Sequence, residues 1–573
     1  MAHVKQYGIH ELCLHARAKK PFDTPLKAHF TAPDGTKITV WGFYDGDDRF
    51  LIRFMPEQEG IYTYETVSPL PVLHGVIGSF QCTSADGHGK VMPDGLYLKH
   101  ADGTRHYSVG TTCYAWIYQP DSVRKDTLSE LKKGYFNKIR MCVFPKWYLY
   151  NEEQPELYPF EGTPGSFDYD TPNVKLFQRL DETVTRLRES NIQADIILFH
   201  PYDADNWGFS RMSRAQDERY IRYVTARLGA FSNVWWSAAN EYDLFRIGYK
   251  AKKSGWQHIL RCIRESDPYG HMLGIHQCFR FFNHRNPCLT HCSLQCTGVY
   301  MSTELTGDFQ KKYGKPVVWD EIGYEGDVKA MFGNCTPEDL VRRFWEAAVH
   351  GGFAGHGETF LDPGNVLWWA KGGKLHGQSQ FRIQFLKELM EDYGNPRFTC
   401  IGSSDQYPEG AEEDSVFAWY FGNTQSRAQD IVLPSRHGYQ VEIIDTWNMK
   451  RTILDGTFSG VCEVPLGGKP YMAVFARKVK SAPLPQQYSP DCLLRDLQHY
   501  PGGRKIYRLM TETPVLGGNT FVLYDTLDHL QTMAGDVVTD RMIEEICGYA
   551  NDGKLLHHLF GMLKKRSSHE NTD

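Results

Sequence analysis

Two glutamates of this chain each follow directly on a short apolar run. Glu241 ends the stretch NVWWSAANE, and Glu321 lies at the end of KPVVWDE. Each carboxylate therefore stands where a buried strand is expected to give way to a polar loop. Cleavage of a glycosidic bond needs such a pair, because one carboxylate attacks the anomeric carbon while the other stays protonated and assists the leaving oxygen. Proximity separates the two roles, since the charge on the first raises the pKa of the second.

Between about residues 107 and 395, short apolar runs alternate with longer helical stretches, a pattern typical of βα units around a parallel sheet. Eight such units in roughly 290 residues match the usual size of a (β/α)8 TIM barrel. In that fold the active site lies at the C-terminal ends of the strands. The expected strands are 106–113, 137–144, 193–200, 233–240, 272–277, 292–296, 316–323 and 352–359.

The regions on either side of the barrel differ from it. Short alternating runs closed by Asp-Gly or Glu-Gly turns predict an N-terminal β-sandwich over 1–88, ahead of a barrel over 89–395. A second β-rich stretch predicts a C-terminal β-sandwich over 396–480. A small helical extension over 490–573 follows, and we expect it to serve core packing or oligomer contact. Its helices are predicted around Met542, Ile543, Ile546 and Cys547, and around Leu555, Leu556, Leu559, Phe560 and Leu563.

Strand alternation gives a first prediction of which acidic groups face the barrel interior. Glu241 shares a face with Ser237 and Ala239, small residues that suit a crowded interior. Glu321 shares a face with Trp319, so its neighbour Asp320 is expected to point toward the helix layer, as a helix cap or a salt-bridge partner. This parity favours Glu321 over Asp320 as the catalytic group.

Composition restricts the partners and the compartment. The net charge of -6 is small for 573 residues, so neither nucleic acid nor an anionic membrane is indicated as a partner. The N-terminal stretch lacks the apolar core of a signal peptide, and no window is long and apolar enough to span a bilayer. The 14 cysteines are scattered, unlike a secreted disulfide framework. We therefore expect a cytoplasmic protein that acts on small imported glycans or glycosides.

The Asn-Glu pair and the later strand-terminal Glu resemble the large clan of retaining (β/α)8 glycosidases that includes β-galactosidases, β-mannanases and cellulases. The resemblance implies that Glu241 is the acid/base, Glu321 the nucleophile and Asn240 the ligand of the sugar 2-hydroxyl. Arg140, in NKIRMCVF, matches the arginine that orients the nucleophile, and a guanidinium there would also keep Glu321 ionised. His200 and His276 match looser polar positions of the subsite. For retention, the two carboxyl groups should lie about 5–5.5 Å apart.

A narrower resemblance, over roughly residues 25 to 480, is to the apiosidase-like bacterial glycosidases, which share the sandwich–barrel–sandwich order. It rests on GTTCYAWIYQ, HGETF and LWWAKGGKLHGQSQFR. Glu358 is the main rival for a catalytic carboxylate. Of the adjacent residues Trp368 and Trp369, only one would face the pocket if the segment is extended. The further candidates for substrate binding are Trp116, Tyr324, His356, Glu358, Trp368 and Trp369.

No cofactor is predicted. His291, Cys292 and Cys296 lack the spacing of a metal site and are expected to belong to a buried strand, and no nucleotide fingerprint is present. The sequence favours a glycosidase that acts on a terminal β-linked sugar. Three alternatives remain open: a transglycosylase with the same intermediate, a non-catalytic glycan-binding barrel, and a barrel lyase or isomerase acting on a phosphorylated sugar. A homo-oligomer formed through the extension is also compatible with the sequence.

Overall fold

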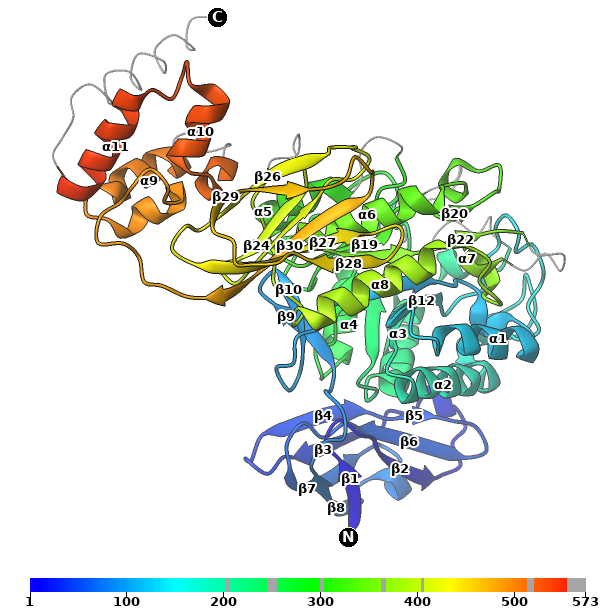
Figure 1. Ribbon diagram of the computed structural model, residues 1–573. Helices are drawn as coiled ribbons and strands as arrows, with labels where there is room; N and C mark the ends of the chain where they lie inside the picture. The colour runs from blue at the N-terminus through cyan, green and yellow to red at the C-terminus, as the bar shows by residue number, and fades with distance from the viewer. Residues whose placement is uncertain are drawn as a thin grey trace, which may run out of the picture. The chain divides into compact units, whose positions relative to one another are not determined.

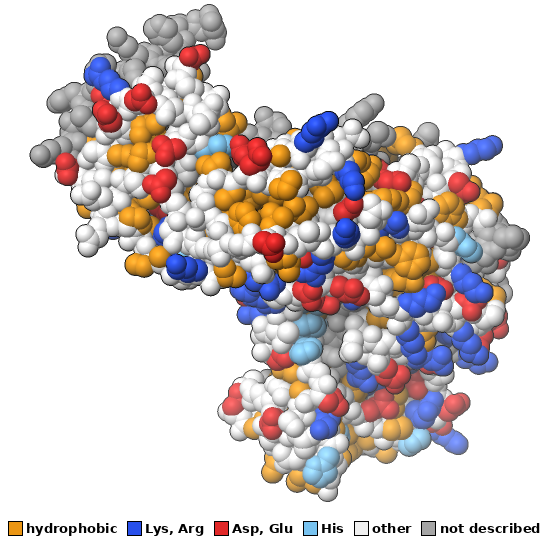
Figure 2. Space-filling view, viewed as in Figure 1, with side chains coloured by type: hydrophobic (Ala, Val, Ile, Leu, Met, Phe, Trp, Pro, Cys, Tyr) orange, Lys and Arg blue, Asp and Glu red, His pale blue; other side chains and the backbone are white. Residues whose placement is uncertain are grey.

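The computed structural model describes residues 1–200, 206–244, 255–298, 303–361, 367–402, 407–512 and 520–553. The chain divides into two compact units (Figure 1). The first comprises Met1–Thr303, Asp308–Phe344 and Gly352–Asn395, and the second Glu304–Gly307, Trp345–Gly351 and Pro396–Asp573. Side chains of both charges are interspersed over the visible face (Figure 2), in keeping with the small net charge. Within the described residues, no helix is long and apolar enough to cross a membrane.

The first unit begins with a β-sandwich. Its core is aromatic: the rings of Phe30 and Phe54 stack at 3.9 Å, and Phe80 packs beside them. The larger sheet has the order β1 (Ala2–Lys5), β8 (Ile77–Thr83), β7 (Gly60–Val67), β3 (Lys27–Thr31) and β4 (Lys37–Trp41). The smaller sheet consists of β2 (His10–His15), β6 (Arg49–Phe54) and β5 (Phe43–Tyr44). A hairpin of β9 (Val91–Asp94) and β10 (Tyr97–His100) leads into the barrel.

The barrel contains all eight predicted strands as one parallel sheet. They are β11 (Val109–Thr112), β12 (Lys138–Cys142), β15 (Gln193–Ile197), β16 (Val234–Ser237), β17 (Leu273–Gly274), β18 (Cys292–Gln295), β19 (Val317–Glu321) and β21 (Phe353–His356). Neighbours in the sheet follow chain order, and β21 closes on β11. Between β17 and β18, the Thr290 N–H donates to the Leu273 carbonyl at 3.0 Å. The barrel is therefore nearly closed.

Helices surround this sheet in the usual alternation. They are α1 (Asp121–Leu131), α2 (Val174–Glu189), α3 (Arg214–Leu228), α4 (Trp256–Ser266), α5 (Thr306–Tyr313), α6 (Pro337–Val349), α7 (Trp368–Lys371) and α8 (Ser379–Asp392). Helix α2 shows why the sequence folds this way. Leu176, Leu180, Val184 and Leu187 recur on one buried face, and the Asn173 side chain caps the first turn.

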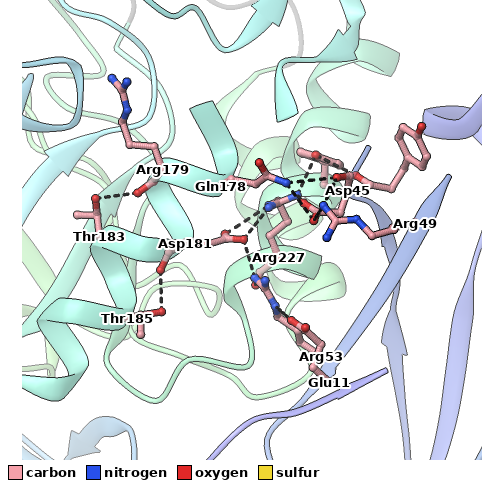
Figure 3. Close-up of polar contacts among 12 residues, drawn as sticks. Glu11, Asp45, Arg49, Arg53, Gln178, Arg179, Asp181, Thr183, Thr185 and Arg227 are labelled. Atoms are coloured by element: carbon pink, nitrogen blue, oxygen red, sulfur yellow. Dashed lines mark hydrogen bonds and ion pairs between the residues drawn. The ribbon is translucent and has the colours of Figure 1, made fainter. Parts of the chain in front are cut away.

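The sandwich and the barrel meet through α2 and α3 (Figure 3). Arg227 of α3 lies between Asp181 of α2 and Asp45 of the sandwich, at 2.6 and 2.8 Å. Arg53 of β6 pairs with the same Asp181 at 2.9 Å. These ion pairs are largely buried, so they join the two parts within one unit.

The second unit combines a β-sandwich with the helical extension. One sheet has the order β23 (Thr399–Cys400), β24 (Glu409–Glu412), β25 (Val416–Tyr420), β30 (Met472–Lys480), β27 (Gly438–Asp445) and β28 (Lys450–Ile453), and the other pairs β26 (Ala428–Leu433) with β29 (Gly460–Pro465). The extension has its own apolar core, to which Leu497, Ile543 and Tyr549 belong. It includes α9 (Gly503–Glu512), α10 (Leu527–Ala534) and α11 (Asp540–Asp552). Helix α11 contains the predicted Met542–Cys547 stretch, whereas the helix expected around Leu555 to Leu563 lies outside the described residues.

Candidate active site

Glu321 is the last residue of β19, but simple alternation does not explain its orientation. Leu294 of β18 pairs with Trp319, and the next residue, Gln295, pairs with Glu321, so Asp320 is the extra residue of a bulge. Trp319 packs against Phe309 of α5, on the outer side of the sheet. Asp320 therefore points inward, and the prediction that it faces the helix layer is wrong. The bulge breaks the alternation and lets Glu321 turn toward the barrel mouth as well.

Inside the barrel, Asp320 is the ion-pair partner that the sequence suggested. The Lys138 ammonium lies 2.7 Å from Asp320 and 3.2 Å from Asp195, and all three side chains are buried. Arg140, two residues after Lys138 on β12, lies 3.4 Å from Asp195 and 3.8 Å from Asp320. Two cations thus face two carboxylates directly beneath Glu321.

Arg140, Tyr114 and Tyr324 lie next to Glu321, and Asn240 contacts the first two. Arg140 Nη1 lies 3.5 Å from its Oε1, and the Tyr114 hydroxyl donates to the same oxygen. Asn240 Oδ1 is 3.2 Å from that hydroxyl and 3.3 Å from Arg140 Nη2. The Tyr324 hydroxyl also lies beside Glu321. The structure therefore brings Arg140, Asn240 and Tyr324 together with Glu321, as the sequence predicts, and adds Tyr114.

Burial decides the protonation of Glu321. Loss of solvent raises the pKa of its carboxyl from the ordinary 4.5 to about 8, against a smaller lowering by Tyr324. The Arg140 charge is shared with Asp195 and Asp320, so it is not available to Glu321 alone. The expectation that Arg140 keeps Glu321 ionised is therefore not met in the free protein, because the cost of burial exceeds what a shared guanidinium returns.

Glu241 follows β16 in a left-handed backbone conformation, with φ at 46°. Few non-glycine residues adopt this region, and such strain is often found at functional sites. The Glu241 N–H lies 3.4 Å from His276 Nδ1, and that nitrogen lies 3.9 Å from Glu321 Oε1. Burial holds the pKa of His276 well below its ordinary value, so the ring is neutral. His276 thus stands between the two glutamates.

The side chain of Glu241 has contacts of its own. With its amide oriented to satisfy both neighbours, Gln295 donates to Glu241 Oε1 at 3.2 Å and to the Gln277 carbonyl at 3.1 Å. The thiol of Cys278 lies near the same carboxylate, whose charge contributes to the raised pKa of that thiol. The pKa of Tyr324 is raised well above its ordinary value by burial and by the charges of Glu321 and Glu241. Both carboxylates are therefore close enough to influence one phenol.

The remaining candidates are divided between the mouth and other places. His200 is buried beside the Phe144 carbonyl, at 3.3 Å. Trp369 contacts Tyr148 and Tyr324, with ring centroids 4.8 and 5.7 Å apart. Trp368 points elsewhere, to Thr111, and its segment is the short helix α7 and not an extended strand. The two rings point in different directions, but the expectation assumed an extended segment and this segment is helical.

Three predicted substrate ligands lie away from this group. Trp116 lies between α1 and α2, where its indole N–H donates to the Arg124 carbonyl, because the chain turns outward after β11. His356 is fully buried under Phe136 and contacts Thr111. Glu358 is also buried, and both of its oxygens accept backbone N–H groups, which leaves it poorly placed to bind a sugar hydroxyl or to rival Glu321.

The sequence did not predict three residues of this site, Tyr114, Lys146 and Gln295. Tyr114 lies in the motif GTTCYAW, two residues before the predicted Trp116. The Lys146 ammonium lies 3.4 Å from the centroid of the Tyr114 ring, a cation–π contact that nothing in its loop sequence indicates. Gln295 is a polar residue at the end of β18, and this position is the signal in the sequence that could have identified it. Glu325, His356 and Glu358 form a separate buried group with metal-ligating atoms.

Comparison with known families identifies the barrel. Residues 92–393, more than half of the chain, match the family described as apiosidase-like, catalytic domain. Residues 3–69 and 405–477 match two domains of unknown function, DUF5060 and DUF5605. The chain therefore belongs to the apiosidase-like glycoside hydrolases, as the motifs predicted. It is a glycosidase built on a TIM barrel.

Solved structures agree with this assignment. A predicted glycoside hydrolase from Bacteroides vulgatus ATCC 8482 is 33% identical, with a TM-score of 0.78 over 84% of this chain and 100% of that chain. A family 5 glycoside hydrolase from the same strain is 16% identical, with a TM-score of 0.51 over 68% of this chain and 94% of that chain, and shares the fold. No curated protein gives a significant match.

Proposed function

We propose that this glycosidase retains anomeric configuration by double displacement. Glu321 attacks C1 of the sugar while Glu241 protonates the leaving oxygen, and Glu241 then activates the water that releases the sugar from Glu321. The observation that carries the proposal is the position of His276, whose Nδ1 contacts the Glu241 backbone and lies 3.9 Å from Glu321. The His276 ring thus lies next to both Glu241 and Glu321 at the mouth of the barrel.

The residues around Glu321 fit this division of roles. Asn240 Oδ1 accepts from Arg140 and Tyr114, so its amide is oriented with the nitrogen as the donor to a sugar hydroxyl. Tyr114 donates to Glu321 Oε1 and the Arg140 guanidinium lies 3.5 Å from the same oxygen, so both reduce the cost of ionising this buried carboxyl. Because the pKa of Glu321 is raised, burial alone does not assign the roles of nucleophile and acid to the two glutamates. We propose that bound substrate completes the assignment, because its leaving oxygen takes the proton of Glu241.

The proposed substrate is a terminal β-linked sugar of a small glycan or glycoside. Trp369, which lies beside Tyr148 and Tyr324, is the aromatic side chain that we propose for stacking on the sugar ring. The protein is expected to work without a redox or group-transfer cofactor, since acid/base and nucleophilic chemistry suffice for hydrolysis.

A panel of chromogenic β-glycosides with added azide tests the roles. Glu321→Ala should lose hydrolysis and, with azide, form the glycosyl azide of inverted configuration on substrates with good leaving groups. Glu241→Ala should form the azide of retained configuration, because its covalent intermediate still forms. Glu358→Gln serves as the control and should show no azide rescue. If Glu321→Ala hydrolyses the best substrate as fast as wild type, the nucleophile is misassigned.

The same assay separates hydrolysis from glycosyl transfer. Both reactions share the glycosyl-enzyme intermediate, so only the products distinguish them. A hydrolase should release free sugar as its main product even when an alcohol or sugar acceptor is added. Predominant transfer product at low acceptor concentration would instead identify a transglycosylase.

A further inference from the structure

A compact group of three buried side chains lies apart from Glu241 and Glu321. Glu325 is on β20 (Glu325–Gly326), Glu358 is on β22 (Glu358–Thr359), and His356 ends β21. Strands β20 and β22 are parallel, with Glu325 directly opposite Glu358. One potential ligand atom from each of the three residues lies within 4.8 Å of the others, and each residue is at most 1% exposed.

Backbone N–H groups bind both carboxylates of this group. Glu358 accepts the N–H groups of His376 and Gly377, and Glu325 accepts those of Gln378 and Ser379, just before and at the start of α8. The Arg382 guanidinium has an electrostatic interaction with Glu325. Two buried carboxylates at this spacing repel each other when both are ionised, and a metal ion bound between them would remove that repulsion.

His356 supplies the observation that favours a metal ion. Its Nδ1 lies 3.1 Å from Thr111 Oγ1, which also accepts the Trp368 indole N–H at 2.8 Å. Its Nε2 has no partner, although the side chain is fully buried, and the hydroxyl of Ser379 beside Glu325 has none either. Buried polar atoms almost always have a partner, which can be an ion or a water. A metal-binding imidazole usually has its other ring nitrogen held by a hydrogen bond, as Thr111 holds Nδ1 here.

We propose that Glu325, His356 and Glu358 bind one divalent transition-metal ion, Zn²⁺ or Mn²⁺. Two carboxylate oxygens and a neutral imidazole nitrogen suit these ions, whereas Ca²⁺ and Mg²⁺ prefer oxygen ligands alone. Bonds of about 2.0–2.2 Å require the three atoms to approach each other slightly. Glycine at 377 permits the close packing, because a Cβ there would lie 2.4 Å from Glu325 Oε2.

The ion would have a structural role. It would tie the segments that follow β19 and β21 to the start of α8, and Tyr324, which lies beside Glu321, precedes Glu325 directly. The ligands are closed off from solvent, so the ion needs no open coordination position for substrate. The inference is independent of the proposed catalytic roles, because none of the three residues takes part in them.

Metal content and thermal stability of the full-length protein test the site. The protein is treated with a chelator under mildly destabilising conditions, supplied with Zn²⁺ or Mn²⁺, desalted and analysed by plasma mass spectrometry. We expect about one tightly held ion per chain and a Tm several degrees above that of the chelator-treated protein. Cobalt in place of zinc should add visible absorption bands typical of nitrogen and oxygen ligands.

Variants connect the ion to these residues. His356→Gln and Glu358→Gln should each abolish tight binding and make Tm insensitive to Zn²⁺ and Mn²⁺. Glu409→Gln is the matched control, since Glu409 is a carboxyl with a pKa raised by burial to about 7 and belongs to the second unit. If wild type holds no ion above background and its Tm does not change, the proposal is overturned. A proton shared by the two carboxyl groups would then take the place of the ion. Because that result comes from wild type, it decides even if a variant fails to fold.

Discussion

At the scale of single residues, the unusual feature is the number of carboxylates around one guanidinium. Arg140 contacts Asp195, Asp320 and Glu321, and Lys138 contacts the first two. If all three acids were ionised, two cations would face three anions in a buried space. Burial raises the pKa values of Asp195 and Glu321, while the Lys138 and Arg140 cations hold that of Asp320 well below its ordinary range. Asp195, a structural acid, and Glu321, the proposed nucleophile, are therefore the two groups of this cluster that can hold a proton.

The raised pKa of Glu321 predicts an alkaline activity profile. The attacking carboxylate must be ionised, so on a substrate whose leaving group needs no proton from Glu241, kcat/KM should fall about tenfold for each pH unit below the Glu321 pKa of about 8. The profile of kcat/KM against pH on a chromogenic substrate measures this limb directly, and Tm at each pH shows that the protein stays folded. An acid limb near the ordinary value of 4.5 would mean that Arg140 and Tyr114 outweigh burial.

Tyr114→Phe should weaken catalysis without unfolding the protein. The variant removes one hydrogen bond to Glu321 and one to Asn240, so we expect kcat to fall about 100-fold. The acid limb of kcat/KM should also move to higher pH, because a donor to the ionised carboxylate is lost. Tyr118→Phe is the control: its hydroxyl donates to the Val143 carbonyl instead. Equal effects of both substitutions on kcat and on the limb would contradict a specific role for Tyr114.

At the scale of elements, the sequence predicted the strands better than their side-chain directions. All eight barrel strands follow from apolar runs such as VVWD and ADII, because a strand covered on both faces must be apolar along its length. The direction that strand alternation predicts for Asp320 is wrong, because the bulge between β18 and β19 depends on how these two strands pair. Residue order along one strand carries no information on that pairing.

The candidate site was predicted in part for a related reason. Asn240, Glu241 and Glu321 were identifiable because they are polar residues at strand ends. Tyr114 was not, since an aromatic residue in a barrel is most often part of the core. His356 also stands near a strand end, but its ring turns under Phe136 to meet Thr111. Position at the mouth end of a strand therefore selects candidates, and only tertiary contacts separate substrate ligands from buried polar groups.

Asp267 shows how one acid holds a connection between elements. It follows α4 directly and accepts the Trp236 indole N–H of β16 at 3.1 Å and the backbone N–H groups of Tyr269 and His271. The His271 ring and these donors keep the Asp267 pKa at about 2 despite burial. Because this folded-state pKa is below the unfolded value, the carboxylate stabilises the protein above about pH 4, and the contribution is lost as pH falls through 2.

The expected effect follows from that shift. Asp267→Asn should lower the free energy of unfolding by about 2–3 kcal/mol at pH 7. The difference from wild type should shrink as the pH is lowered below 4, where the wild-type carboxylate also becomes protonated. Urea unfolding of both proteins between pH 7 and the lowest pH at which they stay folded measures it. A difference that does not change with pH would show that charge on Asp267 contributes nothing.

At the scale of the whole molecule, the first unit depends on a buried ionic contact between its two parts. The Asp181 carboxylate of α2 binds Arg227 of the barrel and Arg53 of the sandwich, and Arg227 also binds Asp45 (Figure 3). Two guanidiniums thus share one carboxylate. Such a network specifies one docking geometry, because any displacement leaves a charge buried without its partner.

Asp181→Ala should therefore loosen the sandwich from the barrel. The variant leaves Arg227 and Arg53 with fewer counter-charges, and we expect a loss of about 3–5 kcal/mol in the free energy of unfolding. The neighbouring Glu182→Ala is the matched control, because Glu182 forms an exposed pair with Arg186 on the same helix and should cost about 0–1 kcal/mol. Urea unfolding gives both values. Limited proteolysis should cut Asp181→Ala faster in the 89–106 connection, since undocking of the sandwich exposes that segment. If the two substitutions cost the same, the ionic contact does not hold the sandwich, and the apolar packing of Tyr269 against the sandwich core must do so instead.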